Sequence, residues 1–529
     1  MKHFWLRGEP QVIATAAALG ITLLLTLTLV IVVLVNGMGF FWPAGVARTV
    51  LKDGTVLAGE ITAREKGQPP RLQFKIGNRD LYGQDFRWVD RAEITSLSYP
   101  SDLIVLERKE HGNFYGFIKT VSVDGERAAA GGDPAQRLDA AWKQVAGKSK
   151  TASSLDKQVS DLTYQAERIR QQMAKLSHDD RQGNTATIAA LKGRLDETLA
   201  RIDGLAEQQN GEATELRRAA VTVADAAGTG KEIPIADIVR IYRPNSMTVW
   251  AKTMYYLERL RELLFDEPRE SNTEGGLFPA IFGTVMMVLL MTLFSLPFGV
   301  IAAVYLREYA QEGFLVRMVR IAVNNLAGVP SIVYGVFGLG FFVYGIGSGL
   351  DRLLYPERLP TPTFGTGGIL WSSLTLALLT VPVIIVATEE SLAAIPKGIR
   401  EGSLSLGATK FQTLTRLLLP MATPGIMTGM VLSMARAAGE VAPLMLVGVV
   451  KLAPSLPIDM RFPFFHMDRK FMHLGFHIYD VGFQSPNVEA AKPMVYVTTL
   501  LLLAIVIAAS SSAIYLRTIM KKRYTTRTF

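Results

Sequence analysis

Two charged residues stand alone in a long apolar stretch near the end of the chain. Arg436 and Glu440 are the only charges within residues 417–450, and their separation of four places them on one face of a helix. A charge at a bilayer centre costs about 2.5–3.5 kcal/mol on insertion scales, so both side chains must face protein or water. The planar donors of a guanidinium match the oxygens of an oxyanion. The pair predicts either an anion path through a membrane or an internal ion pair that fixes helix packing.

Other residues that often carry chemistry lack the necessary pattern. Residues 228–232 read Gly-Thr-Gly-Lys-Glu, but the Ser or Thr that follows Lys in a phosphate loop is missing, as is the first Gly. His466, His473 and His477 share one loop without a metal-ligand spacing, and we expect ordinary surface or interface histidines. We therefore expect no enzyme activity, no metal site and no cofactor on this chain.

The composition indicates a membrane protein with one sizeable polar region. The chain has 49% hydrophobic and 19% charged residues and a mean hydropathy of +0.23. Six apolar stretches are long enough to cross a hydrocarbon core of about 30 Å. They are residues 10–47, 275–306, 321–350, 359–388, 417–450 and 493–516. The sequence thus predicts a mainly α membrane protein with six transmembrane helices. The first helix belongs to an N-terminal unit, residues 1–47, and its apolar stretch is too long for a cleaved leader.

The distribution of charge predicts the orientation in the membrane. Lys2 and Arg7 precede the first apolar stretch, and the tail after Leu516 is basic without any acid. Both termini are therefore expected in the cytoplasm and residues of about 48–274 outside it. The basic residues within 451–492 conflict with this orientation, because that loop must also lie outside. The net charge of +9 suits membrane lipid headgroups and an anionic solute, and no cluster indicates nucleic acid.

The polar region after the first apolar stretch predicts an extracytoplasmic α+β domain over residues 48–245. Short runs such as residues 49–61, 71–76 and 103–107 have the composition of strands, and residues 92–100 recur in part as residues 236–244. Within this domain, apolar residues at steps of three and four predict a coiled-coil helical hairpin at about residues 153–216. Such a seam is usually for packing, and the alternative is a partner-binding arm. The chain has no cysteine, which excludes disulfides.

Residues 246–274 connect this domain to the membrane. Met247, Trp250, Met254, Leu257 and Leu260 fall on one helical face, which predicts a helix at the membrane interface followed by a turn-rich linker.

A polar loop between two apolar stretches, Glu401 to Pro420, reads EGSLSLGATKFQTLTRLLLP. Glu401 to Ser405 predicts a short helix, Gly407 a turn with positive φ, and Lys410 to Leu419 a second helix that Pro420 ends. The spacing resembles the E-A-A-x3-G-x9-I-x-L-P loop of ABC-importer permeases, which docks on a separate ATPase subunit. The matching positions are Glu401, Gly402, Ser403, Gly407, Leu417, Leu419 and Pro420, with Gly402 and Ser403 in place of the Ala-Ala pair.

Three further motifs extend this resemblance. Residues 275–284 read GGLFPAIFGT, residues 325–335 read NLAGVPSIVYG, and residues 435–444 read ARAAGEVAPL. With the loop, they resemble the PstA-type permease of bacterial phosphate importers, loosely over the first apolar stretch and closely from Gly275 to the end.

The resemblance implies a type I ABC importer permease fold in the bacterial cytoplasmic (inner) membrane. The permease core would be residues 275–529, with five transmembrane helices and a coupling loop at 389–420. It implies a PstC-type sister permease, a PstB-type ATPase dimer that carries ATP and Mg, and a periplasmic PstS-type phosphate-binding protein. It also implies that Arg436 and Glu440 belong to the phosphate path. The insertion at residues 48–246 is absent from compact family members.

Two alternatives remain open on the sequence. One is a permease for another oxyanion, such as sulfate, molybdate or phosphonate. The other is a membrane sensor or scaffold that signals phosphate status through the outer domain.

Overall fold

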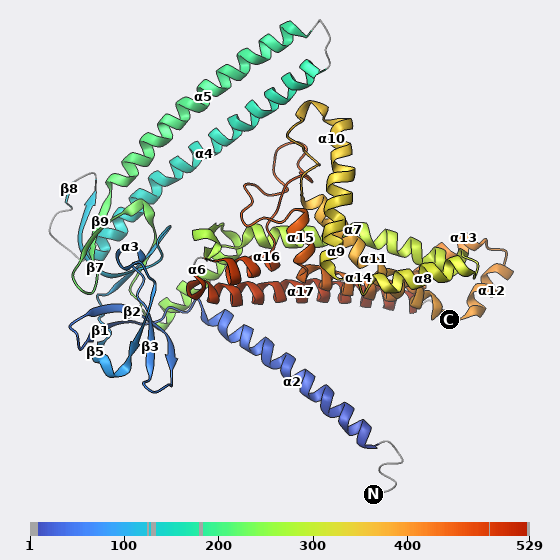
Figure 1. The fold of residues 1–529 in the computed structure, drawn as a ribbon, viewed down its shortest axis with the longest axis horizontal. Helices are drawn as coiled ribbons and strands as arrows, with labels where there is room; N and C mark the ends of the chain where they lie inside the picture. Colours follow the sequence, from blue (N-terminus) through green and yellow to red (C-terminus); the bar gives the residue numbers. More distant parts are fainter. Residues whose placement is uncertain (1–8, 124–125, 128–133, 179–183, 486, 526–529) are drawn as a thin grey trace.

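The computed structural model describes residues 9–123, 126–127, 134–178, 184–485 and 487–525. A bundle of long helices forms one part of the molecule, and two β-sheets with a protruding helical hairpin form the other (Figure 1). The β-sheets lie at one end of the bundle, and the short helices α12 (Lys397–Ser405) and α13 (Lys410–Thr413) lie at the opposite end. The chain is thus mainly helical, with an N-terminal β region apart from the helical bundle.

The described residues contain six helical segments that are long and apolar enough to cross a membrane. This number agrees with the sequence prediction. The helices are α2 (Glu9–Gly39), α7 (Phe278–Val304), the continuous run α9 (Ser331–Phe337), η5 (Gly338–Gly347) and α10 (Ser348–Leu354), α11 (Ile369–Ala393), α14 (Leu419–Gly439) and α17 (Val488–Thr525).

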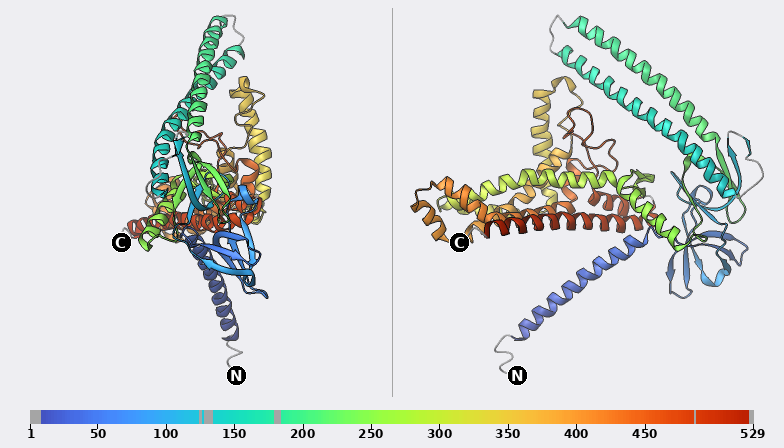
Figure 2. Two further views of the ribbon diagram at one scale, coloured as in Figure 1. Left: turned by 90° about the vertical axis from the view of Figure 1, so that its left-hand side faces the viewer. Right: turned by 180° about the vertical axis from the view of Figure 1, so that it is seen from behind.

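Helix α11 is the centre of the bundle. It packs between α7 and α14, and the shared core includes Met287, Met291, Leu376, Leu379 and Ala437. In its most apolar window 67% of the residues are buried, against 6% in α2. Helix α2 leaves the bundle at an angle and meets α17 only near its own C-terminal end (Figures 1 and 2). Most of α2 is therefore apolar surface in the isolated chain.

Two of the predicted spans are broken. The stretch 321–350 divides into α8 (Phe314–Leu326), a turn, and the helix that begins at Ser331. Pro330 has no N–H and disfavours helical geometry at Val329, so a helix cannot continue through this point. The helix from Ser331 to Leu354 then stands across the bundle in every view of Figures 1 and 2. Its direction was not predictable from an apolar run.

The stretch 417–450 is broken as well. Helix α14 ends at Gly439, Glu440 has an extended backbone with ψ 131°, and a short helix α15 (Ala442–Val447) follows with Pro443 in its first turn. The prediction that Arg436 and Glu440 lie on one continuous helix is therefore wrong, because Glu440 lies just beyond the helix end.

The β region consists of two sheets with the same strand order. The first contains β1 (Val46–Leu51), β2 (Val56–Glu65), β3 (Arg71–Lys75), β4 (Phe86–Asp90) and β5 (Ile94–Ser98), in the order β4-β3-β2-β1-β5. The second contains β6 (Ile104–Arg108), β7 (Phe114–Val123), β9 (Ala220–Ala224), β10 (Gly230–Pro234) and β11 (Ile238–Tyr242), in the order β10-β9-β7-β6-β11, with β8 (Glu126–Arg127) beside β7. When β8 is left out and the strands are numbered within each sheet, both orders are 4-3-2-1-5.

The local sequence repeat lies at corresponding places in the two sheets. A one-turn helix, η1 (Arg91–Glu93) or η2 (Ile235–Asp237), precedes the last strand in each case. The short recurrence in the sequence is thus part of a structural duplication of the five-stranded unit.

A helical hairpin is inserted in the second sheet between β7 and β9. It consists of α4 (Pro134–His178) and α5 (Thr185–Arg218), which pack antiparallel (Figure 1). The hairpin agrees with the prediction, but α4 begins well before residue 153 because Leu138, Ala141 and Val145 pack into the core of the sheet. The predicted turn lies mostly at residues 179–183, outside the described residues. A coiled-coil geometry of the hairpin stays a prediction.

The shaft of the hairpin contacts two loops of the helical bundle. The Tyr164 hydroxyl donates to the carbonyl of Phe462 at 2.9 Å, and the Arg461 guanidinium lies 4.8 Å from the Tyr164 ring centroid. Farther along α4, Arg358 donates to Gln171 at 2.9 Å. The β region and its hairpin therefore touch the bundle along the hairpin as well as at the base of the β region.

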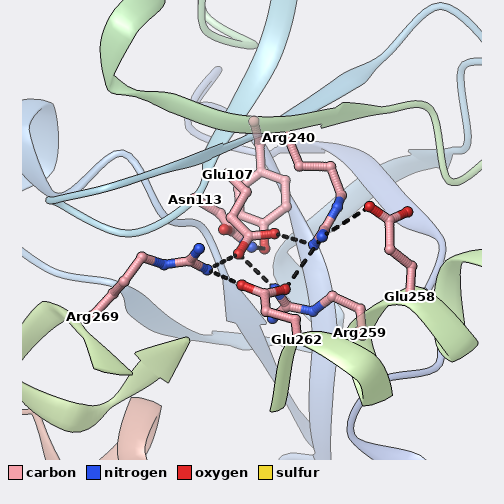
Figure 3. A network of polar contacts seen from close by, with 8 residues as sticks. Glu107, Asn113, Arg240, Glu258, Arg259, Glu262 and Arg269 are labelled. Atoms are coloured by element: carbon pink, nitrogen blue, oxygen red, sulfur yellow. Dashed lines mark hydrogen bonds and ion pairs between the residues drawn. The ribbon is translucent and has the colours of Figure 1, made fainter. Parts of the chain in front are cut away.

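A buried ion-pair network joins the β region to the helix α6 (Val249–Phe265) at that base (Figure 3). Glu107 of β6 pairs with Arg240, Arg259 and Arg269 at 3.1, 2.6 and 2.7 Å. Glu262 of α6 pairs with the same three guanidinium groups at 3.2, 2.9 and 2.7 Å. Because buried charges are stable only when paired, this network fixes α6 against the sheet.

Glu274 lies beside this network, in the small strand β13 (Glu274–Gly275) that leads into α7. Burial raises the pKa of its carboxyl to about 7, Lys75 opposes this, and the carboxylates of Glu107 and Glu270 add to it. A carboxyl whose pKa rises on folding binds its proton more tightly in the folded state. Its contribution to stability is therefore complete below about pH 4.5 and is lost as the pH rises through 7.

We predict that Glu274→Gln removes this loss. The wild-type protein should lose about 3 kcal/mol of stability between about pH 4 and 8 that the variant retains, at about 1.4 kcal/mol per pKa unit. Thermal unfolding of the purified protein against pH measures the difference. The exposed neighbour Glu267 provides the control, since Glu267→Gln should leave the pH profile unchanged. Parallel pH profiles for the wild type and Glu274→Gln would contradict the assignment.

Candidate functional site

The helices that follow two helix breaks, α9 and α15, touch one another in the bundle. The first break lies between α8 and α9, at residues 327–330, and the second lies between α14 and α15, at residues 440–441. A Cβ atom at Gly335 of α9 would lie 2.7 Å from Cα of Pro443 in α15, so the two helices touch backbone to backbone. Across the first break, the buried Tyr334 hydroxyl donates to the carbonyl of Leu326 at 2.8 Å.

Arg436 lies in the last turn of α14, beside this junction. Its Nε is 3.7 Å from Oε1 of Glu440, which is an ion pair but longer than a hydrogen bond. Within the described part of the chain, the Arg436 guanidinium donates no hydrogen bond in addition to this ion pair. The Arg436 side chain is 37% exposed, and Tyr334 lies within electrostatic reach of it. The structure thus brings both predicted residues together at the second break, as a loose pair at the surface of the bundle.

The chemistry of this junction is binding rather than bond making. Broken helices leave backbone N–H and C=O groups without helical partners, and this is tolerated at membrane depth only where protein or a water-filled path covers them. A permanent cation beside two such breaks can hold an anion through its planar donors. The described residues contain no group of His, Asp and Glu side chains able to hold a metal ion.

The coupling loop forms a compact helical knob at the far end of the bundle. Gly407 has φ +84° between α12 and α13, in agreement with the predicted turn. Helix α12 begins at Lys397 rather than Glu401. Thr409 and Gln412 form a reciprocal capping box at the start of α13, with distances of 3.2 and 2.9 Å. Ser403 and Thr413 join the two helices through their hydroxyl groups at 2.9 Å.

The prediction that Pro420 ends the second helix is wrong. The helical chain continues from α13 through the π-helical turn η7 (Leu414–Leu418) into α14, where Pro420 occupies the first turn. A π-turn shifts the hydrogen-bond pattern by one residue, so the missing N–H of proline is accommodated at the start of the next helix. The knob is therefore continuous with the helix that carries Arg436.

The predicted coupling residues divide into an exposed set and a packed set. Glu401, Gly402 and Gly407 are exposed and Ser403 is half-buried. Leu417 and Leu419 are half-buried, and Leu419 packs with Leu418 on the core that includes Leu392 and Ile395. The exposed face also presents apolar side chains that the motif did not identify. These are Leu404, Leu406, which is 90% exposed, and Phe411.

Arg400 anchors the knob, and the motif alone did not indicate its role. Its guanidinium pairs with Glu308 at 2.9 Å and donates to the carbonyls of Leu392 and Ile395 at 2.6 and 2.9 Å. The Lys410 ammonium lies 4.7 Å from the Tyr309 ring centroid. Glu308 and Tyr309 belong to the turn η4 (Tyr305–Tyr309) after α7. These contacts connect the knob to α7 and α11 as well as to α14.

The three histidines are buried, so of the expected surface or interface positions the surface position is wrong. His466 pairs with Asp459 at 3.0 Å, and His477 hydrogen-bonds Thr498 and the carbonyl of Asn272, both at 3.2 Å. His473 accepts the N–H of Gly475 at 3.1 Å. Each has a local structural partner.

We predict that Gly407→Ala loosens the knob. A left-handed backbone costs an L-residue roughly 1–2 kcal/mol, and no neighbouring atom adds a clash at this site. Amide hydrogen exchange over residues 397–413 should accelerate by about 5–30-fold, as expected for such a loss of local stability. Gly398→Ala is the matched control, because Gly398 is equally open but helical, so alanine should leave exchange unchanged or slow it. Equal exchange in both variants would contradict the role of the Gly407 turn.

Part of the chain is similar to known proteins. Residues 295–523 match the family model described as binding-protein-dependent transport system inner membrane component. The probable ABC transporter permease protein YqgH of Bacillus subtilis is 34% identical over 194 residues, which are 36% of this chain and 59% of YqgH. The probable phosphate transport system permease protein PstA of Methanocaldococcus jannaschii is 34% identical over 189 residues, 35% of this chain and 60% of that protein. The phosphate transport system permease protein PstA of Mycobacterium leprae is 37% identical over 175 residues, 33% and 52% of the two chains.

The chain thus spans little more than half the length of the curated relatives it matches. Among solved structures, the inward-facing MetNI methionine ABC transporter aligns with a TM-score of 0.34 at 20% identity, over 46% of this chain and 94% of that chain, a likeness too low to carry an argument. Residues 295–523 are therefore similar to the inner membrane component of binding-protein-dependent transport systems and to ABC transporter permeases.

Proposed function

We propose that this chain is the permease subunit of an ATP-driven phosphate importer. It forms half of the transmembrane phosphate path and docks on a separate ATPase. The observation that carries the proposal is the position of Arg436 beside two helix breaks, at the end of a helix that is continuous with the exposed knob. The names of the two PstA relatives favour phosphate as the solute.

In this proposal Arg436 receives the anion. The loose pair with Glu440, at 3.7 Å, neutralises the guanidinium when the path is empty. An arriving phosphate offers oxygens in the geometry that a guanidinium prefers, and it replaces Glu440 as the partner of Arg436. Its departure restores the ion pair, so the anion can leave again. The exposure of Arg436 in the single chain supports a path that lies at a surface covered by the sister permease.

The energy for transport comes from the partner ATPase, which binds ATP and Mg. The exposed knob surface, with Glu401, Leu404, Leu406 and Phe411, enters a cleft on that subunit. Closure of the ATPase moves the knob, and Arg400 passes the movement to α7 and α11. The continuous helix through η7 and α14 passes it to Arg436, which opens the path alternately to each side.

The proposed assembly follows the family pattern. A PstC-type sister permease forms the other half of the path, a PstB-type ATPase dimer binds the two knobs, and a PstS-type binding protein delivers phosphate. The chain lies in the bacterial inner membrane with both termini in the cytoplasm and residues of about 48–274 outside.

We predict that Arg436→Gln raises the KM for phosphate uptake by about tenfold or more, because a charge-assisted hydrogen bond contributes about 1.5–3 kcal/mol. The measurement is ATP-dependent uptake of labelled phosphate in vesicles that contain the complete importer. Arg317→Gln is the control, since Arg317 is exposed on α8 and lies outside the proposed path. If Arg436→Gln leaves phosphate uptake unchanged, the Arg436–Glu440 pair only fixes helix packing and does not bind the anion.

The same assay separates phosphate from other oxyanions. If unlabelled sulfate, molybdate or phosphonate competes as strongly as unlabelled phosphate, that anion replaces phosphate as the proposed solute. ATP hydrolysis without uptake of any of these anions would contradict the proposed transport function.

A further inference from the structure

Helix α6 presents an uncovered apolar stripe. Trp250, Met254 and Leu257 follow one another at helical spacing, and Trp250 is 74% exposed. Arg261, on the same side, is exposed as well. The opposite side of α6 carries Arg259 and Glu262, which enter the buried ion-pair network of Figure 3. One face of α6 is thus packed against the protein, and the opposite face is exposed.

The network determines which face is bare. Glu107 and Arg240 belong to neighbouring strands of the second sheet, and both pair with α6 residues on a single side of the helix. A rotation of α6 that buried its apolar stripe would separate these buried charges, which is costly. The apolar stripe therefore stays outward as long as the outer region is folded.

The position of α6 indicates what the stripe faces. Its last turn is joined to the start of α7 by the N–H of Leu277, which donates to the carbonyl of Leu263 at 2.7 Å. Near its middle, Tyr256 packs against Phe41 and Trp42, just beyond α2, with centroid distances of 6.3 and 6.4 Å. Helix α6 is therefore held between the outer ends of two candidate membrane spans, where a bilayer surface must lie.

The residue types suit that position. Tryptophan is enriched at the boundary between headgroups and acyl chains, and Trp42 and Trp250 both stand exposed in this zone. Basic side chains such as Arg261 lie favourably at the level of lipid phosphates.

We propose that α6 binds the surface of the lipid bilayer. Trp250, Met254 and Leu257 enter the boundary between headgroups and acyl chains at the outer ends of α2 and α7. The ion-pair network connects this lipid-bound helix rigidly to the second sheet. The bilayer surface thereby sets the position of the outer region relative to the membrane core, a role that is independent of which solute is transported.

The absence of cysteine from the chain allows a direct test. Met254→Cys and Leu257→Cys place a single thiol on the stripe, and Trp88→Cys places one on the exposed edge strand β4. Each full-length variant is labelled with a bimane fluorophore and reconstituted into phosphatidylcholine–phosphatidylglycerol vesicles. The vesicles contain either ordinary or brominated lipids, and iodide is added as a quencher from the water.

We expect brominated lipid to remove about half of the fluorescence at residues 254 and 257, with little effect of iodide, as for side chains at the acyl boundary. The label at residue 88 should show the reverse. Quenching by iodide at all three positions would overturn the proposal, because α6 would then lie in water. Protection from both quenchers at 254 and 257 would also overturn it and would indicate a protein partner. The substituted side chains are exposed, and a matching size-exclusion profile confirms that each variant is folded.

Discussion

The structure depends on one constraint of the hydrocarbon layer. Backbone groups that lack a helical partner cannot face lipid, so a helix breaks at membrane depth only where protein or water covers the break. Here the helices that follow the two breaks, α9 and α15, pack on one another, whereas Ala327, Gly328 and Pro330 of the first break are exposed in the isolated chain. Gly335 and Pro443 allow α9 and α15 to touch, and Tyr334 satisfies the carbonyl of Leu326. Arg436 is placed at this junction because α14 ends there.

The same helices connect the junction to the opposite end of the bundle. The knob between α11 and α14 is joined to three helices at once, through Arg400, through the packed leucines, and through the unbroken chain of η7 and α14. These contacts connect the knob to the helix that carries Arg436. The β region is joined to α6 by the network around Glu107 and Glu262.

The sequence predicted those features that depend on composition and local periodicity. Six apolar segments, the hairpin and the Gly407 turn could all be identified from local patterns. The breaks could not, because an apolar run has the same appearance whether its helix is straight or interrupted. Pro330 was a visible signal of one break. The π-turn before Pro420 has no signal in the sequence, so Pro420 was wrongly predicted to end a helix. The network around Glu107 unites residues from distant segments, so only the tertiary structure reveals it.

The central claim is that the two breaks line an anion path, and thiol accessibility tests it most directly. Val441→Cys introduces the only thiol of the chain at the second break, and Leu432→Cys serves as reference on the exposed side of α14. In the complete importer, a negatively charged thiol reagent should modify residue 441, and phosphate should slow this reaction by about tenfold, equivalent to about 1.4 kcal/mol of protection. Residue 432 should show no protection. If phosphate leaves the reaction at residue 441 unchanged, or residue 441 never reacts, the breaks do not line the path.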